Sequence, residues 1–302
     1  MKLELHREGA VCVVDTTGGE ILSYRTPTGR SCLWNGDESV WPGHSPHLFP
    51  IIGTLPGGRY QLNGRSYCMG KHGFLRGTEF AVQSRTPESV TLIRRETEES
   101  LACYPFRFSF CVTHTLRPGG FETSYQIINH STDAMPFCVG GHPAFACPVS
   151  DDESFADYEL LLPGLNAFTA LRAESDAPLS RCSCVRLPVQ NGALPLSHAF
   201  LGDCVWIFEQ TACHQAILRS KKHAYSAQLT FDDFPNFAVW TFGAKQAGYL
   251  CIEPWYGLPC LETDGPALTD KPACIVLAPH EQKRLSYRVR FCEGPLLPSA
   301  ER

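Results

Sequence analysis

Alternating apolar and polar side chains run through the longest regular stretch of the chain. From Phe106 to Leu116 the even-numbered residues are apolar apart from His114, while the odd-numbered ones are mostly polar. A period of two is typical of a β-strand with one buried face. Pro118–Gly120 supplies a turn, and Phe121–Ile128 returns with a similar pattern. We therefore predict one long antiparallel hairpin.

A second hairpin is predicted around Asn63 and Gly64, because Asn-Gly favours the tight turn that matches the twist of paired strands. Its strands are Gly58–Leu62 and Arg65–Tyr67. Further strands are predicted at Ala10–Asp15, Glu20–Tyr24, Phe80–Ser84, Ser89–Arg95, Cys204–Glu209, Gln215–Arg219, Tyr225–Phe231, Ala238–Thr241 and Leu285–Phe291. The 23 prolines and 25 glycines suit many short strands joined by turns.

Helical signals are weak in this sequence. Only Thr97–Cys103 and Pro195–Leu201 are expected to form a helical turn or two. Asp151–Ser197 has no clear period, so long surface loops are expected there. No change of composition marks a linker. The sequence therefore predicts a single all-β domain over residues 1–302, built as a large antiparallel β-sandwich.

The charge of the chain limits the classes of partner. A formal net charge of −5 and an isoelectric point near 6.1 argue against a basic surface for nucleic acid or an anionic membrane. No apolar run approaches the roughly 20 residues that span a bilayer, and Met1–Glu8 lacks the apolar core of a signal peptide. We expect a soluble cytoplasmic protein, a monomer or homodimer, with a small neutral partner.

The 15 cysteines are scattered along the chain, and none forms a Cys-x-x-Cys pair. That spacing does not favour a zinc knuckle. We interpret the cysteines as reduced thiols that fill apolar space, which agrees with a reducing cytoplasm.

Glu253 stands among apolar and aromatic neighbours. Tyr249–Ile252 is predicted as a short buried strand, and Pro254 biases Glu253 toward an extended backbone. The carboxylate is thus expected at a strand end, with a fixed direction. Trp255 and Tyr256 offer flat rings that suit the CH-rich face of a sugar. The alternative is a solvated carboxylate at the start of a loop, with the aromatic rings in the core.

His142 has the same local arrangement, a titratable side chain followed by a proline. Gly140 and Gly141 precede it and permit close approach by a ligand or a neighbouring strand. Histidine has an unperturbed pKa near 6.5, so it can exchange a proton at neutral pH. The alternative is a core histidine that is hydrogen-bonded in a glycine-rich corner.

His72 and Arg76 are predicted to lie in a loop, where Gly73 and Gly77 permit unusual backbone angles. An imidazole and a guanidinium are good donors to the hydroxyl groups of a polyol, and Arg76 could also bind a phosphate. Taken alone, an arginine in a loop is usually solvated.

Five motifs, in order, make the chain resemble the aldose 1-epimerase (mutarotase) family, in particular its bacterial mutarotase-like branch. The resemblance covers nearly the whole length and implies the galactose mutarotase-like β-supersandwich. The motifs are Phe49-Pro50-Ile51-Ile52-Gly53, His72-Gly73-Phe74-x-Arg76, Pro136-Phe137 with Gly140-Gly141-His142-Pro143-Ala144-Phe145, Phe231-Asp232-Asp233-Phe234-Pro235 and Ile252-Glu253-Pro254-Trp255-Tyr256-Gly257.

The resemblance implies interconversion of the α and β anomers of a hexose by ring opening and closure. Glu253 matches the family's base, which takes the proton from the anomeric hydroxyl, and His142 matches the acid that protonates the ring oxygen. We expect an ionised carboxylate and a histidine held protonated beside it. Such chemistry requires no metal, nucleotide or redox cofactor.

Four further residues are expected to bind the sugar. His72 matches a histidine that orients the substrate, and Arg76 matches an arginine that holds hydroxyl groups. Asp203 falls near the family's substrate-binding aspartate, and Trp255 is expected to line the site.

One position departs from the family pattern. Thr54 follows the first motif, where the family normally has an arginine. Loss of that cation would alter affinity or sugar preference, so the substrate stays open.

Three other functions remain possible on the sequence. A non-catalytic carbohydrate-binding or regulatory β-sandwich would keep the aromatic residues and Arg76 without needing both proton-transfer groups. A hexose-6-phosphate 1-epimerase would use cations such as Lys71 and Arg76 for the phosphate. A metal-dependent hydrolase or isomerase could draw on His44 and His47 together with the histidines and the carboxylate named above.

Overall fold

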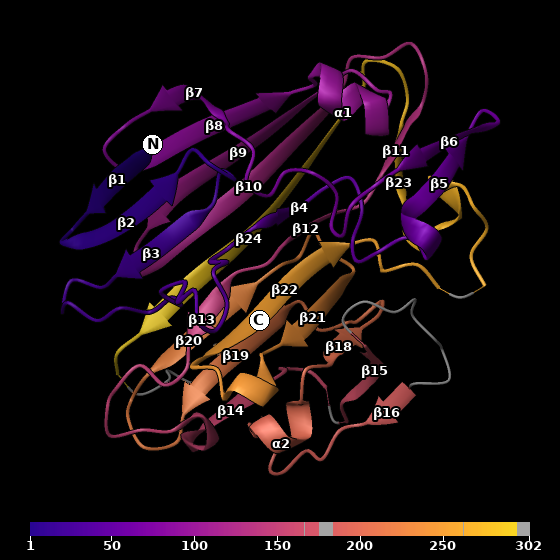
Figure 1. The fold of residues 1–302 in the computed structure, drawn as a ribbon. Helices are drawn as coiled ribbons and strands as arrows, with labels where there is room; N and C mark the ends of the chain where they lie inside the picture. Colours follow the sequence, from indigo (N-terminus) through magenta and orange to yellow (C-terminus); the bar gives the residue numbers. More distant parts are fainter. Residues whose placement is uncertain (166, 175–183, 262, 295–302) are drawn as a thin grey trace.

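Two large antiparallel sheets dominate the computed structural model, which describes residues 1–165, 167–174, 184–261 and 263–294 (Figure 1). The nine-stranded sheet has the order β17 (Ala193–Pro195), β14 (Tyr158–Leu161), β19 (Gln215–Ser220), β20 (Ser226–Thr230), β24 (Gln282–Cys292), β10 (Gly120–Asn129), β9 (Phe108–Arg117), β8 (Ser89–Arg95) and β7 (Ala81–Arg85).

The eight-stranded sheet carries the residues that matter for function. Its order is β16 (Cys184–Arg186), β15 (Thr169–Ala173), β18 (Val205–Phe208), β21 (Asn236–Trp240), β22 (Tyr249–Tyr256), β12 (Val139–Gly141) and β4 (His47–Leu48), with β13 (Ala144–Ala146) also paired to β22.

Smaller elements surround these two sheets. They are the sheet β1 (Lys2–Arg7), β2 (Ala10–Asp15) and β3 (Ile21–Arg25), the pairs β5 (Arg59–Leu62) with β6 (Arg65–Cys68) and β11 (Met135–Phe137) with β23 (Ile275–Leu277), the helices α1 (Glu98–Cys103) and α2 (His198–Leu201), and the 3-10 turns η1 (Pro56–Gly58), η2 (Phe155–Asp157), η4 (Gly243–Lys245) and η5 (Leu268–Asp270). Among the described residues, no helix is both long and apolar enough to cross a membrane.

One hydrophobic core joins the two large sheets. Phe110 and Tyr125 enter it from the nine-stranded sheet, and Leu250 and Ile252 enter it from the eight-stranded sheet. All four side chains are almost completely buried. Burial of apolar surface between two sheets is the main stabilising contribution in such a fold. The predicted all-β antiparallel β-sandwich is confirmed.

The predicted hairpins are also confirmed. β9 and β10 pair with Leu116 opposite Phe121, so the turn is as short as the sequence indicated. Asn63 and Gly64 both adopt positive φ angles, 49° and 74°, as the tight Asn-Gly turn requires. The alternating pattern and the turn residues together set the register.

The prediction of long loops over Asp151–Ser197 is wrong where strands form, although Pro163 and Gly164 do lie in a turn between β14 and β15. This segment contains β14, β15, β16 and β17, each of three to five residues. Strands this short show no period of their own, and they form because they extend the edges of large sheets.

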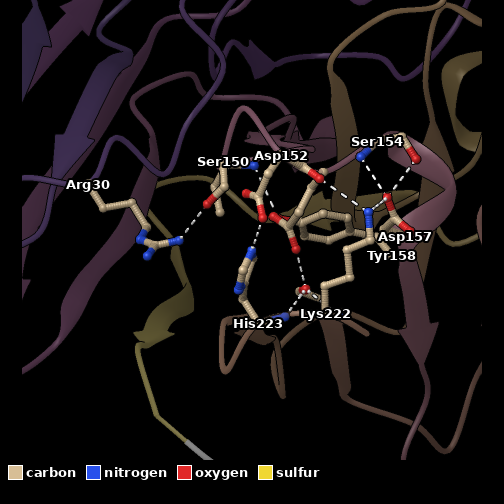
Figure 2. A network of polar contacts seen from close by, with 11 residues as sticks. Arg30, Ser150, Asp152, Ser154, Asp157, Tyr158, Lys222 and His223 are labelled. Atoms are coloured by element: carbon tan, nitrogen blue, oxygen red, sulfur yellow. Dashed lines mark hydrogen bonds and ion pairs between the residues drawn. The ribbon is translucent and has the colours of Figure 1, made fainter.

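A polar network fastens part of this segment to the turn between β19 and β20 (Figure 2). His223 Nε2 lies 2.8 Å from the Asp152 carboxylate, and Lys222 Nζ lies 3.0 Å from the Asp157 carboxylate. Both ion pairs are exposed to solvent, which screens their charges, so each is expected to add little to the stability of the fold. Their role is to position the loop.

Candidate active site

His142 and Glu253 are brought together by the register of β22 with its neighbours. Gly140 of β12 lies opposite Trp255, and Ala144 of β13 lies opposite Cys251. The same register continues through the gap between β12 and β13 and places His142 opposite Glu253. Residues directly opposite in an antiparallel pair point to the same face. His142 Nε2 lies 3.2 Å from Glu253 Oε1.

Two prolines account for the gap in the ladder. Pro143 and Pro254 have no N–H to donate, so regular pairing stops between Gly141 and Ala144. β22 nevertheless continues to Tyr256, and Glu253 lies inside the strand rather than at its end. The prediction that Glu253 lies at a strand end is therefore wrong. Pro254 does not end β22, because it faces the gap in which neither β12 nor β13 pairs with this strand.

The His142–Glu253 pair lies in a cavity on the face of the eight-stranded sheet away from the main core. The cavity encloses about 630 Å³ of non-protein space, including solvent at its mouth. Its lining residues are Trp41, Gly53, Thr54, Lys71, His72, Arg76, His142, Ala173, Glu174, Val205, Ile207, Trp240, Glu253, Trp255 and Pro259. Alternation along β22 separates these side chains from Leu250 and Ile252, which enter the core.

His72 is held at the cavity by contacts with the first motif. Its backbone N–H donates to Gly53 O at 2.8 Å, and the Gly53 N–H donates to His72 Nδ1 at 3.1 Å. Because Nδ1 accepts, the proton of the neutral ring is on Nε2. Gly73 is required next to it, since a Cβ there would lie 1.9 Å from Phe49 O. The two motifs are therefore one structural unit.

Arg76 brings positive charge to the pair. The residue keeps exposed surface, yet its guanidinium is packed closely enough for burial to lower its pKa, while Glu253 and Glu20 act in the opposite direction. An arginine still remains charged at neutral pH. Arg76 in turn lowers the pKa of Glu253 relative to burial alone. The guanidinium is thus close enough to act electrostatically on the carboxylate.

Burial reverses the protonation states that the sequence suggested. It raises the pKa of Glu253 to about 8, with Arg76 opposing the change. Burial and then the charge of Arg76 lower the pKa of His142 well below its usual value. Burial, Arg76 and His142 likewise lower the pKa of His72. At neutral pH both pKa shifts favour a protonated Glu253 beside a neutral His142.

A stability prediction follows from the raised pKa of Glu253. Since the folded pKa exceeds the unfolded value of about 4.5, the folded state retains a proton that the unfolded chain releases between pH 4.5 and 8. The contribution of Glu253 to wild-type stability should therefore fall with rising pH through this window, by at most about 1.4 kcal/mol per pH unit, while the lowered pKa values of His142 and His72 act in the opposite direction below pH 6.5.

The Glu253→Gln variant tests that dependence, because it cannot ionise. Chemical denaturation of both proteins from pH 4.5 to 9 should show the variant gaining stability over the wild type as pH rises, with a plateau above pH 8. A constant difference across the range would contradict a raised pKa for Glu253.

Two buried polar atoms of the pair lack partners within the described part of the chain. Among those residues, Glu253 Oε2 and His142 Nδ1 make no hydrogen bond, and neither does Nε1 of the buried Trp255. The indole still lowers the pKa of Glu253, although no hydrogen bond of normal geometry joins them. Unpaired buried groups are costly, and at a cavity they indicate where a polar ligand binds.

Metal ligation was a further possibility. The donor atoms of His142, Cys251 and Glu253 all lie within 4.8 Å of one another, which is a donor set that zinc accepts. The charge of Arg76, which acts on both Glu253 and Cys251, opposes a dication there. His47 is used elsewhere, because its ring nitrogens bond to Tyr125 Oη and Gly19 O in the core.

The structure does not bring Asp203 into the cavity. Asp203 Oδ1 accepts a hydrogen bond from the Ala244 N–H at 2.9 Å and borders a separate hollow beside η4. The next residues of the chain do line the cavity through Val205 and Ile207 of β18. Its position just before a strand did not indicate which way the carboxylate turns, and the predicted binding role has no support from the cavity lining.

Sequence reasoning missed two aromatic residues of the site. The rings of Trp41 and Trp240 lie 5.2 and 5.8 Å from the His142 ring. Trp240 follows the alternation of β21 and could have been found once the register was known. Trp41 lies in a stretch without regular strand or helix, so no period indicated it.

Comparison with known proteins agrees with this geometry. The aldose 1-epimerase family model matches residues 1–290. Protein LacX (chromosomal) of Lactococcus lactis subsp. lactis is 29% identical over 296 residues, covering 96% of this chain and 99% of LacX.

Solved structures give the same result. A galactose mutarotase related enzyme from Lactobacillus acidophilus has a TM-score of 0.92 at 27% identity, covering 99% of this chain and 100% of that chain. A galactose mutarotase-like protein from Lactobacillus casei has a TM-score of 0.89 at 28% identity, covering 96% and 100%. Since the family model spans nearly the whole sequence, the chain belongs to the aldose 1-epimerase family.

Proposed function

We propose that this protein is an aldose 1-epimerase that interconverts the α and β anomers of a hexose, with Glu253 as base and His142 as acid. The observation that carries the proposal is the contact of these two proton-transfer groups, 3.2 Å apart, in a cavity lined by aromatic and cationic side chains. The names of the related structures, galactose mutarotase related and galactose mutarotase-like, support the same activity.

The short distance within the pair suits a hemiacetal. The anomeric oxygen and the ring oxygen are both bonded to C1, so a base and an acid that act on them must converge on one small region. Glu253 removes the proton of the anomeric hydroxyl while His142 protonates the ring oxygen, and the C1–O bond of the ring opens. Rotation of the C1 aldehyde and the reverse transfers close the ring as the other anomer.

One proton on the pair is sufficient for this cycle. The raised pKa of Glu253 favours the proton on that carboxyl group, and transfer across the 3.2 Å contact gives a carboxylate beside an imidazolium. Glu253 Oε2 has no partner among the residues that the structure describes, and sugar hydroxyl groups that donate to it stabilise that carboxylate form. Positioned proton transfer of this kind typically contributes about 10²–10⁴-fold for each group.

The remaining residues supply binding. His72 Nε2 carries a proton that can be donated to a sugar hydroxyl, since Nδ1 already accepts from Gly53. Arg76 offers several donors in a fork. Trp255 lines the cavity. Flat rings beside polar donors are a common way to bind pyranoses.

Polarimetry tests the proposal. Freshly dissolved α-galactose and α-glucose should approach equilibrium faster with purified protein than in buffer alone, with hexose 6-phosphates as a second panel. Acceleration restricted to the hexose 6-phosphates would favour a hexose-6-phosphate 1-epimerase. The presence of Lys71 and Arg76 at the cavity is the observation that supports this alternative. Sugar binding without acceleration in either panel would favour a non-catalytic binding module.

Two variants test whether residues of the cavity, rather than residues outside it, bind the sugar. Asp203→Asn keeps the acceptor for the Ala244 N–H and lies outside the cavity, so its kcat/KM should stay within about twofold of the wild type. Arg76→Gln removes a donor fork at the cavity and should raise KM about tenfold or more, equivalent to the roughly 1.5–3 kcal/mol of a charged hydrogen bond. A large loss in Asp203→Asn would restore Asp203 as a binding residue.

A further inference from the structure

Three cysteines and a lysine, all buried except the partly exposed Cys274, form a cluster behind the wall of the cavity. The Lys271 ammonium is almost fully buried, and its Nζ lies 3.0 Å from Cys260 Sγ. Cys138 and Cys274 belong to the same hydrophobic cluster as Trp255, whose other side lines the cavity. Nothing in the proposed catalytic cycle uses these thiols.

The pairing of β11 with β23 places two of the thiols face to face. Phe137 lies opposite Ile275 in this antiparallel pair, so one further step along the register sets Cys138 opposite Cys274. The alternation agrees, since Phe137 and Ile275 enter the main core whereas Cys138 and Cys274 enter the cluster with Trp255. Cys274 Sγ is 3.6 Å from Phe137 O, directly beside Cys138.

Backbone hydrogen bonding shows which kind of cross-strand pair this is. The Cys138 N–H donates to Pro50 O and the Cys274 N–H to Lys271 O, so neither amide donates to the opposite cysteine. Opposite residues that do not exchange backbone hydrogen bonds have their Cα atoms about 4.5 Å apart. Disulfides form at Cα separations of about 4.4–6.8 Å.

We propose that Cys138 and Cys274 form a peroxide-sensitive, reversible disulfide that covalently joins β11 to β23 beside Trp255. The two sulfurs already share one side of the strand pair, and Cys274 is partly exposed, which gives a small oxidant a route from solvent. This inference stands on the thiol geometry and does not depend on the proposed sugar chemistry.

The electron balance is that of a two-electron oxidation by hydrogen peroxide. The Cys138 thiolate attacks one peroxide oxygen, the O–O bond breaks, hydroxide leaves, and Cys138 becomes a sulfenic acid. The Cys274 thiol loses its proton and attacks the sulfenic sulfur, and the departing hydroxide takes up a proton to form water. Overall, two thiols and one peroxide give one disulfide and two waters.

The local charges favour Cys138 as the first thiolate. A hydrogen bond from the Cys274 thiol lowers the pKa of Cys138 against the opposing effect of burial, and the nearby Lys271 charge acts in the same direction as the hydrogen bond. The same hydrogen bond and burial raise the pKa of Cys274. A thiolate stabilised beside a cation is the reactive form of a cysteine.

Peptide mapping of the full-length protein after mild peroxide treatment tests the inference. Mass spectrometry should show a linked pair of peptides containing Cys138 and Cys274, with the loss of two hydrogen atoms and of two alkylatable thiols. Dithiothreitol should restore both thiols. Cys274→Ser should abolish the linked pair, whereas Cys292→Ser, which removes another partly exposed thiol, should leave it intact.

The exposed Cys68 serves as an internal check that peroxide has acted. Oxidised Cys68 together with fully alkylatable Cys138 and Cys274 would overturn the inference. A linkage of either residue to a different cysteine would overturn it as well.

Discussion

Replacing Glu253 by Gln is expected to reduce kcat for anomer interconversion by about 10²–10⁴-fold. An amide has nearly the same shape as the carboxyl group but cannot accept the proton of the anomeric hydroxyl. KM should change little, because the binding groups of the cavity remain in place. The measurement is the initial polarimetric rate across a range of sugar concentrations, with circular dichroism to verify the fold.

The matched control is Glu153→Gln, which alters another buried glutamate of the described chain. Glu153 accepts hydrogen bonds from Tyr158 and Ser220 and does not line the cavity. This variant is expected to lose stability but to keep the kcat of its folded fraction. Equal losses of kcat in the two variants would mean that Glu253 acts through the fold rather than through proton transfer.

Replacing His142 by Asn is expected to cause a second loss of about 10²–10⁴-fold in kcat. Asparagine is polar and smaller, so it fits the site, but it cannot protonate the ring oxygen. His223→Asn is the control, since His223 pairs with Asp152 in the network of Figure 2 and lies outside the cavity.

The kcat losses caused by the two substitutions should not combine in a double variant. Glu253 and His142 share one proton across their contact, so removing either partner disables the same transfer. The double variant Glu253→Gln with His142→Asn should therefore be about as slow as each single variant. Multiplicative losses would show that the residues act in separate steps.

Much of the fold could be predicted from the sequence, because the patterns that indicate strands and turns are local. Alternation fixed β9 and β10, and Asn63 with Gly64 fixed a turn. The short strands β14 to β17 were missed because pairing with a large sheet, rather than a period of their own, makes them strands.

The candidate site also has features that the sequence predicted and features that it did not. The prolines after His142 and Glu253 marked both residues in the sequence. Their contact depends on the register between segments far apart in the chain, which no local signal contains. Burial then reversed the protonation states expected from reference pKa values. Asp203 lies outside the cavity lining because its carboxylate is directed by a contact with η4, which no local sequence signal indicated.

The most direct test of the central claim is exchange spectroscopy by NMR on an equilibrated hexose. In a solution of galactose or glucose, the protein should produce exchange cross-peaks between the α and β anomeric protons, and these should vanish with the Glu253→Gln variant. That outcome would establish that Glu253 carries the proton transfer which interconverts the anomers. Cross-peaks of equal intensity with wild type and variant, or none with the wild type, would contradict the account.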